Sequence, residues 1–300
     1  MVTDRTNSVL TIIGLLVALS LANISFAEQK TPQQLINESN KAIARNPLSS
    51  VAYYNRGFAY SVLERYQEAI NDYSKAIELK PNDAETYFMR GKANYRIGNL
   101  RQAIKDYDKA VELKPQYAAP YNNRGLVYDK LGNHGQAMSD YNMAIKVDPT
   151  YEIAYVNRGN NYAALNESTH ALSDYDKAIE LNPQYAEAYY ARGNVYYNLR
   201  KIQQAIMDYN KAIKLNPINE GYFNNRGNAY AALGNNGQAI KEYDEAIKLN
   251  PKYADPYFNR AISYSSFNKV DTAHQDLIKA ARLGHKEARQ FLNSQGIQWQ

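Results

Sequence analysis

Prolines divide this chain at a fixed interval of 34 residues. The seven prolines that share the interval are Pro47, Pro81, Pro115, Pro149, Pro183, Pro217 and Pro251. A fixed period of this length indicates one helix–turn–helix unit copied in series. Each proline ends a unit, because proline cannot continue an α-helix without losing a backbone hydrogen bond. The spacing therefore predicts one elongated stack, in which each unit buries its apolar face against its neighbours.

Other residue types recur at fixed distances after each proline. In the first unit an aromatic residue follows six residues on (Tyr53), a small residue ten on (Gly57) and a second tyrosine thirteen on (Tyr60). Alanine returns twenty-two and twenty-nine residues on, with a tyrosine between them at twenty-six, or leucine in the last unit. The first three residues share one face of a helix. Because mid-helix glycine costs about 1 kcal/mol relative to alanine, its return indicates a closely packed partner helix.

The large–small–large pattern, the Ala–aromatic–Ala pattern and the closing proline resemble the tetratricopeptide repeat (TPR) over residues 48–284. The resemblance implies an all-α, right-handed superhelical solenoid of antiparallel helix pairs, built from seven 34-residue units. It also implies that the first helix of each pair lines a concave surface that holds other proteins. One departure is consistent: arginine precedes the small residue in every unit, from Arg56 to Arg260, where the family usually has an aliphatic residue.

The two ends of the array have different patterns. Residues 28–47 are predicted to form a linker and an N-terminal capping helix, with Thr31 as N-cap and Pro32 at the first helical position. Residues 285–300 are predicted to form a C-terminal capping helix and tail. Caps of this kind cover the apolar faces that the outermost repeats would otherwise expose.

Residues 1–27 resemble a secretory signal peptide. Arg5 precedes an uncharged apolar run over residues 9–22, and Ser25-Phe26-Ala27 gives a small-x-small cleavage pattern. The alternative is an uncleaved membrane anchor, since the uncharged stretch is long enough to span a bilayer. Both interpretations place the repeats outside the cytoplasm, in the periplasm or cell envelope. The chain contains no cysteine, which excludes disulfides and thiolate chemistry.

No catalytic, cofactor-binding or metal-binding residues are expected. The four histidines are scattered without ligand spacing, and there is neither a phosphate-binding glycine loop nor a nucleophile elbow. The net charge of +5 is spread along a chain whose repeats all contain acids, which argues against a nucleic-acid partner. A glycan-cleaving enzyme would need paired carboxylates in the groove, and the few acids expected there are not paired.

The recurring arginine has a recurring partner. An acid lies sixteen residues after each one, at Asp72, Asp106, Asp140, Asp174, Asp208, Glu242 and Asp276. We predict seven ion pairs that bridge the two helices of a unit or neighbouring units. For partly exposed pairs, each is expected to contribute at most about 1 kcal/mol.

A helical wheel places two sets of residues on the concave surface. The first set is aromatic and basic: Tyr54, Phe58, Phe88, Lys92, Tyr95 and Arg96. The second set is rich in asparagine: Asn122, Asn160, Tyr190, Asn194, Tyr197, Asn198, Asn224 and Asn228. Asparagine both donates and accepts, so a row of it can hold an extended peptide by its backbone amides. The alternative is that both sets only pack or bond between neighbouring helices.

These patterns lead to one expectation of function. The chain is expected to be an exported, non-enzymatic scaffold that binds a peptide or protein partner in its groove. The alternative is a regulatory or targeting subunit that presents a separate enzyme chain in an envelope assembly. A membrane is expected to be involved only if the N-terminal segment stays uncleaved.

Overall fold

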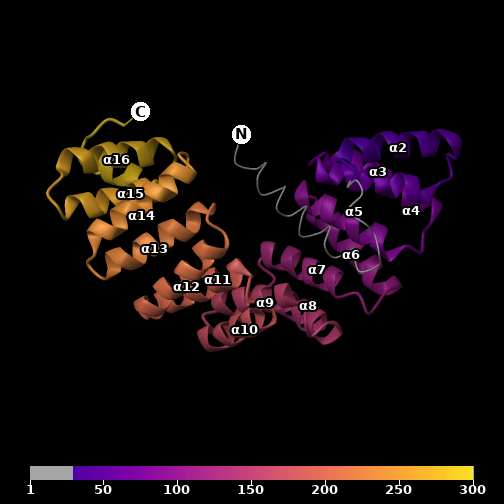
Figure 1. Ribbon diagram of the computed structural model, residues 1–300, viewed down its shortest axis with the longest axis horizontal. Coiled ribbons are helices and arrows are strands. Elements are labelled where there is room, and N and C mark those ends of the chain that lie inside the picture. Colours follow the sequence, from indigo (N-terminus) through magenta and orange to yellow (C-terminus); the bar gives the residue numbers. More distant parts are fainter. Residues whose placement is uncertain (1–29, 300) are drawn as a thin grey trace. The chain divides into compact units, whose positions relative to one another are not determined.

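The structure is a computed structural model that describes residues 30–299, so the signal-peptide prediction for residues 1–27 lies outside the described part. The described residues form α-helices and turns, without strands (Figure 1). They divide into two compact units, and the division falls between Ala154 and Tyr155, inside helix α9 (Glu152–Ala164). No helix within residues 30–299 has the length and apolar character needed to cross a membrane.

Both units are built from helices of 9–14 residues. The first unit contains α2 (Pro32–Arg45), α3 (Ser50–Val62), α4 (Tyr66–Leu79), α5 (Ala84–Arg96), α6 (Leu100–Leu113), α7 (Ala118–Lys130) and α8 (His134–Val147). The second unit contains α10 (Ser168–Leu181), α11 (Ala186–Asn198), α12 (Ile202–Leu215), α13 (Glu220–Ala232), α14 (Asn236–Leu249), α15 (Ala254–Ser265), α16 (Val270–Arg282) and α17 (Lys286–Ser294).

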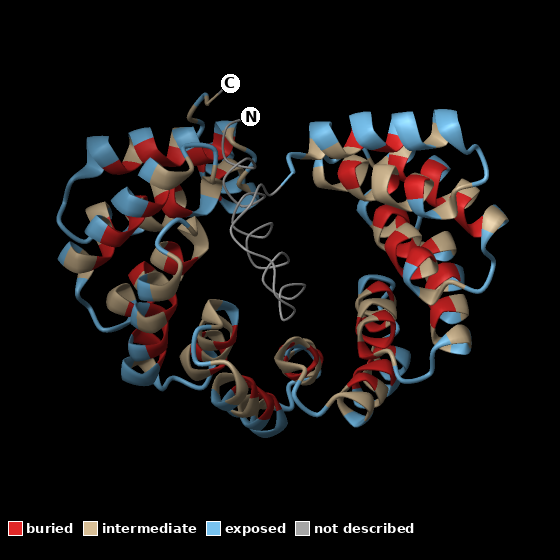
Figure 2. Cartoon of the chain, turned by 45° about the vertical axis from the view of Figure 1, so that its right-hand side comes forward, coloured by how far each residue is buried: buried red, intermediate tan, exposed pale blue. Residues whose placement is uncertain are grey.

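Within each unit, consecutive helices pack against one another, which confirms the predicted all-α solenoid of helix pairs. A first helix starts shortly after each repeat proline, as α5 does after Pro81, and the second helix follows after a short turn. Figure 2 shows that buried residues follow the sides of the helices that meet other helices, while many turn residues are exposed. The first helix of one pair also contacts the first helix of the next pair, as α5 contacts α7.

The core of each of the first six pairs is a tyrosine from the second helix, and Leu277 takes its place in the last pair. The rings of Tyr73, Tyr107, Tyr141, Tyr175, Tyr209 and Tyr243 are at most 1% exposed. Each ring lies against the glycine of the first helix. A Cβ atom added to Gly125, for example, would lie only 2.6 Å from Cε1 of Tyr141. The predicted close packing at the glycine is therefore present, and the group that requires it is the tyrosine ring.

The tyrosines of the first helices differ in burial: Tyr121, Tyr155 and Tyr257 are buried, as the sequence pattern suggested, but others are not. Tyr53 and Tyr60, which the pattern assigns to the core, are only half-buried. The Arg56 guanidinium lies over the Tyr53 ring at 5.5 Å from its centroid, and all seven repeats have an equivalent contact at 5.5–5.6 Å. The recurring arginine thus covers a ring that would otherwise be more exposed.

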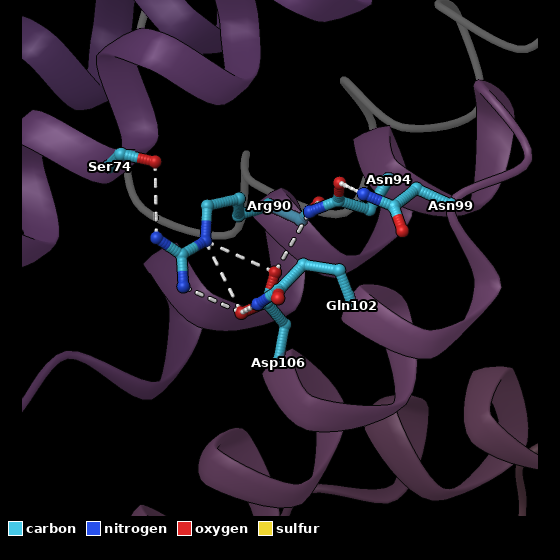
Figure 3. A network of polar contacts seen from close by, with 6 residues as sticks. All are labelled: Ser74, Arg90, Asn94, Asn99, Gln102 and Asp106. Carbon is cyan, nitrogen blue, oxygen red and sulfur yellow. Dashed lines mark hydrogen bonds and ion pairs between the residues drawn. The ribbon is translucent and has the colours of Figure 1, made fainter.

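The seven predicted ion pairs are all present, at 2.6–2.7 Å. Figure 3 shows the second of them, in which Arg90 on α5 reaches Asp106 on α6 and donates to Ser74 of the preceding pair. The arginine therefore links the helices of one pair and also neighbouring pairs. The Asp106 side chain is only 2% exposed. The limit of about 1 kcal/mol applies to partly exposed pairs and stays a prediction, whereas removing one partner of a buried pair costs about 3–5 kcal/mol.

The turn inside each pair contains one residue with positive φ. In three repeats this residue is a glycine, Gly98, Gly132 or Gly234, with φ of 75–80°. The other four repeats use residues with a side chain at the same position: Glu64, Asn166, Arg200 and Asn268, with φ of 56–63°. Glutamate and arginine adopt this conformation at a cost that glycine avoids.

Thr31 is the N-cap residue of α2 and Pro32 is its first helical residue, as predicted. Thr31 accepts a hydrogen bond from the backbone of Gln34, whose side chain bonds back to Thr31. At the other end Trp299 donates to Asn293 at 2.8 Å, and the Arg289 guanidinium lies 4.9 Å from its ring. Ile297 and Trp299 therefore fold back towards α17 and pack against the final core cluster.

Candidate functional site

The candidate site is the groove face, which we define as the side chains seven, eleven, fourteen and fifteen residues after each repeat proline. All fourteen predicted site residues occupy these positions. The two units present different chemistry at them, so each unit is described separately.

Position seven is mostly buried between neighbouring first helices. Phe88 is 7% exposed and packs edge-on against Tyr117 of the next repeat, at a centroid distance of 5.1 Å. Asn122 and Asn224, at the same position, are 2% and 3% exposed. The burial of these three side chains favours the packing interpretation over contact with a partner.

Positions eleven, fourteen and fifteen of the first unit are reachable from solvent. Phe58, Lys92 and Tyr95 are half-buried and Arg96 is exposed. Lys92 Nζ lies 5.5 Å from the centroid of the Phe88 ring. Burial lowers the pKa of Lys92, the neighbouring Arg96 lowers it further, and Glu85 acts in the opposite direction. Tyr54, at position seven, is half-buried against the core ring of Tyr73.

The second unit contains two adjoining cavities. The larger, of about 420 Å³, is lined by Val156, Asn157, Asn160, Ala163, Tyr175, Tyr185, Glu187, Tyr190, Ala191, Asn194, Val195 and Asn198. The smaller, of about 260 Å³, is lined by Asn194, Tyr197, Tyr209, Asn225, Asn228 and again Asn198. The structure therefore brings together six predicted residues: Asn160, Tyr190, Asn194, Tyr197, Asn198 and Asn228.

Three asparagines of these cavities accept hydrogen bonds from core tyrosines. The bond from Tyr175 to Oδ1 of Asn160 is 2.8 Å long, and the bond from Tyr209 to Asn194 is 2.9 Å long. Tyr243 makes the equivalent bond to Asn228, also at 2.9 Å. The carbonyl oxygen of each amide is thus directed at the core, and the Nδ2 group is the donor left for the cavity.

A second chain of amides fixes the wall between the cavities. Asn225 donates from Nδ2 to Tyr190 Oη and to Asn194 Oδ1, both at 2.9 Å, and accepts from Asn224. Asn224 accepts in turn from Asn259. Burial raises the pKa of Tyr190, while a hydrogen bond with Asn194 opposes the rise, so this phenol stays protonated at neutral pH.

That core tyrosines line this site was not predicted from the sequence. Tyr175 and Tyr209 line the cavities although their period assigns them to the core. A usable signal was present, because a buried hydroxyl needs a partner and an asparagine precedes each tyrosine by fifteen residues. Tyr185, which precedes α11, was also missed, since its position lies outside the wheel of the first helix.

Family profiles agree with this architecture. One described as "Tetratricopeptide repeat" matches residues 50–83, 118–151 and 186–219. A second, described as "TPR repeat", matches residues 95–132, 159–199 and 227–266, so that together they cover more than half of the chain. The chain belongs to the tetratricopeptide repeat family. Members of this family typically act as protein-interaction scaffolds and are generally non-catalytic. No curated protein matches the chain.

Solved structures share the fold of this TPR array at low sequence identity. The Cut9–Hcn1 hetero-tetramer of the APC/C matches with a TM-score of 0.69 and 18% identity over 88% of the chain; the chain spans only 54% of that protein. PilF of Pseudomonas aeruginosa matches at 0.63 with 20% identity, over 72% of this chain and 100% of the other. A tetratricopeptide repeat protein from Parabacteroides merdae matches at 0.60 with 20% identity, over 88% and 98%.

Proposed function

We propose that this TPR array binds an extended peptide segment of a partner protein on the groove face of its second unit. The observation that supports the proposal is the fixed orientation of Asn160, Asn194 and Asn228. Their oxygens are occupied by core hydroxyls, so each offers an N–H donor to the cavities. Backbone carbonyls of an extended chain are the matching acceptors, and they recur along a peptide whatever its sequence.

The charge of the residues that line the cavities limits which ligands can bind there. Neither cavity is lined by lysine or arginine, and Glu187 is the one charged residue among the lining residues of the two. Its carboxylate accepts a hydrogen bond from Tyr222 at 2.7 Å. An anionic ligand would meet this carboxylate without any compensating cation. The second unit is therefore suited to a neutral or basic segment held by its main chain.

The decisive variant is Asn194→Asp combined with Asn228→Asp. Aspartate keeps an oxygen that can accept from the core tyrosine but has no N–H group to donate. A peptide selected from a displayed random library against the wild-type chain serves as the probe, and fluorescence anisotropy measures its affinity. Because each lost hydrogen bond contributes about 1 kcal/mol, we expect binding to weaken at least about tenfold.

Asn71→Asp on α4 is the matched control, since Asn71 is exposed on a second helix away from the groove face. It should leave the affinity unchanged. Unfolding by urea should show that the double variant stays folded. Unchanged affinity in a folded double variant would refute the role of the asparagine donors.

We infer that the array works outside the cytoplasm. The support is the sequence alone: the apolar run and the small-x-small pattern in residues 1–27. N-terminal sequencing of the protein from fractionated host cells tests this. A mature N-terminus at Glu28 in an exported fraction would support it, and an intact N-terminus in the cytosolic fraction would contradict it.

A further inference from the structure

Lys92 on α5 is a half-buried cation without an ion pair among residues 30–299. The half-buried arginines of the first unit contrast with it. Arg56, Arg90 and Arg124 each hold a buried carboxylate at 2.6–2.7 Å. The Lys92 ammonium instead lies over the Phe88 ring, at 5.5 Å from its centroid. Since burying an unpaired charge is costly, this ammonium is available for a counter-ion from outside the chain.

Two further cations of the first unit lie at groove positions. Arg96 follows Lys92 by one helical turn and is exposed, and the structure gives its guanidinium no hydrogen-bond or ion-pair partner within residues 30–299. Lys130, at the end of α7, lies with Nζ 5.1 Å from the centroid of the Tyr95 ring. Lys92 occupies position eleven and the other two occupy position fifteen. In the second unit, these same positions line the cavities, as Asn194 and Asn198 do.

The acidic side chains near these cations already accept hydrogen bonds from tyrosines. Glu85 accepts a hydrogen bond from Tyr117 at 2.6 Å, and Asp129 accepts one from Tyr141 at 2.6 Å. Neither forms a salt bridge with Lys92, Arg96 or Lys130. The groove face of the first unit therefore presents three cations, two of them beside aromatic rings, and none of the three forms a salt bridge within residues 30–299.

We propose that this surface, made of Phe58, Lys92, Tyr95, Arg96 and Lys130, binds an acidic segment of a partner protein. Carboxylates of the segment lie against Lys92, Arg96 and Lys130, and an apolar side chain between them packs on Phe58 and Tyr95. Charge-assisted bonds to a partly desolvated cation are stronger than bonds to an exposed one. The proposal rests on the proposed function in so far as the array binds peptides, but it uses different residues in a different unit.

Three fluorescein-labelled decapeptides test the chemistry against the full chain by fluorescence anisotropy. The first alternates glutamate and leucine and is amidated at its C-terminus. The second replaces every glutamate with glutamine and is also amidated. The third is the glutamine peptide with a free C-terminal carboxylate. We expect the acidic peptide to bind at least tenfold more tightly than the amidated glutamine peptide, and more weakly as salt is raised.

The third peptide separates the two sources of carboxylate. Tighter binding of the acidic peptide than of the third supports acidic side chains as the recognised group. Equal binding of the third and the acidic peptide would overturn the assignment to acidic side chains and indicate recognition of a chain terminus. Equal binding of all three peptides would overturn the proposal altogether.

The variant Lys92→Gln with Arg96→Gln locates the site and is expected to weaken acidic-peptide binding at least tenfold. The matched control is Arg101→Gln with Lys105→Gln on α6, which removes the same two charges from exposed positions of a second helix. The control should change affinity less than twofold. An equal loss in both pairs would mean that only net charge matters, and would refute the site.

Two additional measurements keep the test decisive. Arg96→Gln alone changes an exposed side chain, and it should weaken binding at least threefold even if the double variant is less stable. The variant Asn194→Asp with Asn228→Asp should not weaken binding of the acidic peptide. If the proposed asparagine site is wrong, this double variant will bind the library-selected peptide as tightly as the wild type does. That result does not depend on whether the first unit binds the acidic peptide.

Discussion

Gly125→Ala is the substitution whose outcome follows most directly from the packing of this array. Alanine in place of a mid-helix glycine normally stabilises by about 1 kcal/mol. Here the new methyl group would lie 2.6 Å from Cε1 and 2.9 Å from Cδ1 of Tyr141, which is fully buried. The ring cannot easily move, because its hydroxyl donates to Asp129 at 2.6 Å. Overpacking costs about 1–3 kcal/mol, so after subtracting the gain of about 1 kcal/mol from alanine we expect a net loss of up to about 2 kcal/mol.

Two other glycines serve as comparisons for the Gly125→Ala substitution. Gly135 lies in α8 with nothing within 4 Å of an added Cβ, so Gly135→Ala should stabilise by about 0.5–1 kcal/mol. Gly57 is intermediate, since its added Cβ would lie 3.0 Å from Tyr73. Urea unfolding followed by circular dichroism gives the free energies, and hydrogen exchange in α7 and α8 reports the local effect. A Gly125→Ala variant at least as stable as the wild type would refute the steric argument.

Three other substitutions test separate features of the chain. Asp208→Ala leaves Arg192 without its buried partner and should cost about 3 kcal/mol in urea unfolding, whereas Lys177→Ala, in an exposed pair, should cost less than about 1 kcal/mol. Arg200→Gly relieves a φ of 61° and should raise the free energy of unfolding by about 0.5 kcal/mol; a decrease would contradict this. Burial lowers the pKa of Lys92 below 10.5, so the folded chain binds this proton more weakly than the unfolded chain. Stability relative to Lys92→Gln should therefore rise as the pH approaches 10.5 in urea titrations, and a flat difference would argue against its burial.

The architecture was predictable because the sequence repeats each observation seven times. A single arginine sixteen residues before an aspartate, such as Arg56 before Asp72, indicates little. Because an arginine and an acid recur at this offset in every repeat, an ion pair between the two helices of a repeat is the simplest explanation. The positive φ of Arg200 was not predictable in this way. The equivalent turn of another repeat has a glycine at this position, Gly132, whereas this turn has an arginine.

The groove face was only partly predictable, because a helical wheel gives the direction of a side chain relative to its own helix alone. Phe88 points away from its core stripe, as the wheel requires, but the first helix of the next repeat covers that direction and brings Tyr117 onto the ring. Asn122 and Asn224 are buried at the same position. The degree of exposure depends on the offset between successive pairs, which no single repeat encodes.

The hydroxyl of the core tyrosine links the fold to the chemistry of the groove face. In the second unit, position eleven satisfies it, and asparagine suits this position because one end accepts from Tyr209 while the other remains a donor. In the first and third repeats, position fourteen contacts it instead: Ser61 lies 3.3 Å from the Tyr73 hydroxyl, and Asp129 accepts from Tyr141. Position eleven then does not have to accept the hydrogen bond of the core tyrosine, and in the first repeat it is occupied by Phe58. The side chain that satisfies a buried hydroxyl therefore determines whether the groove presents amide donors or other chemistry.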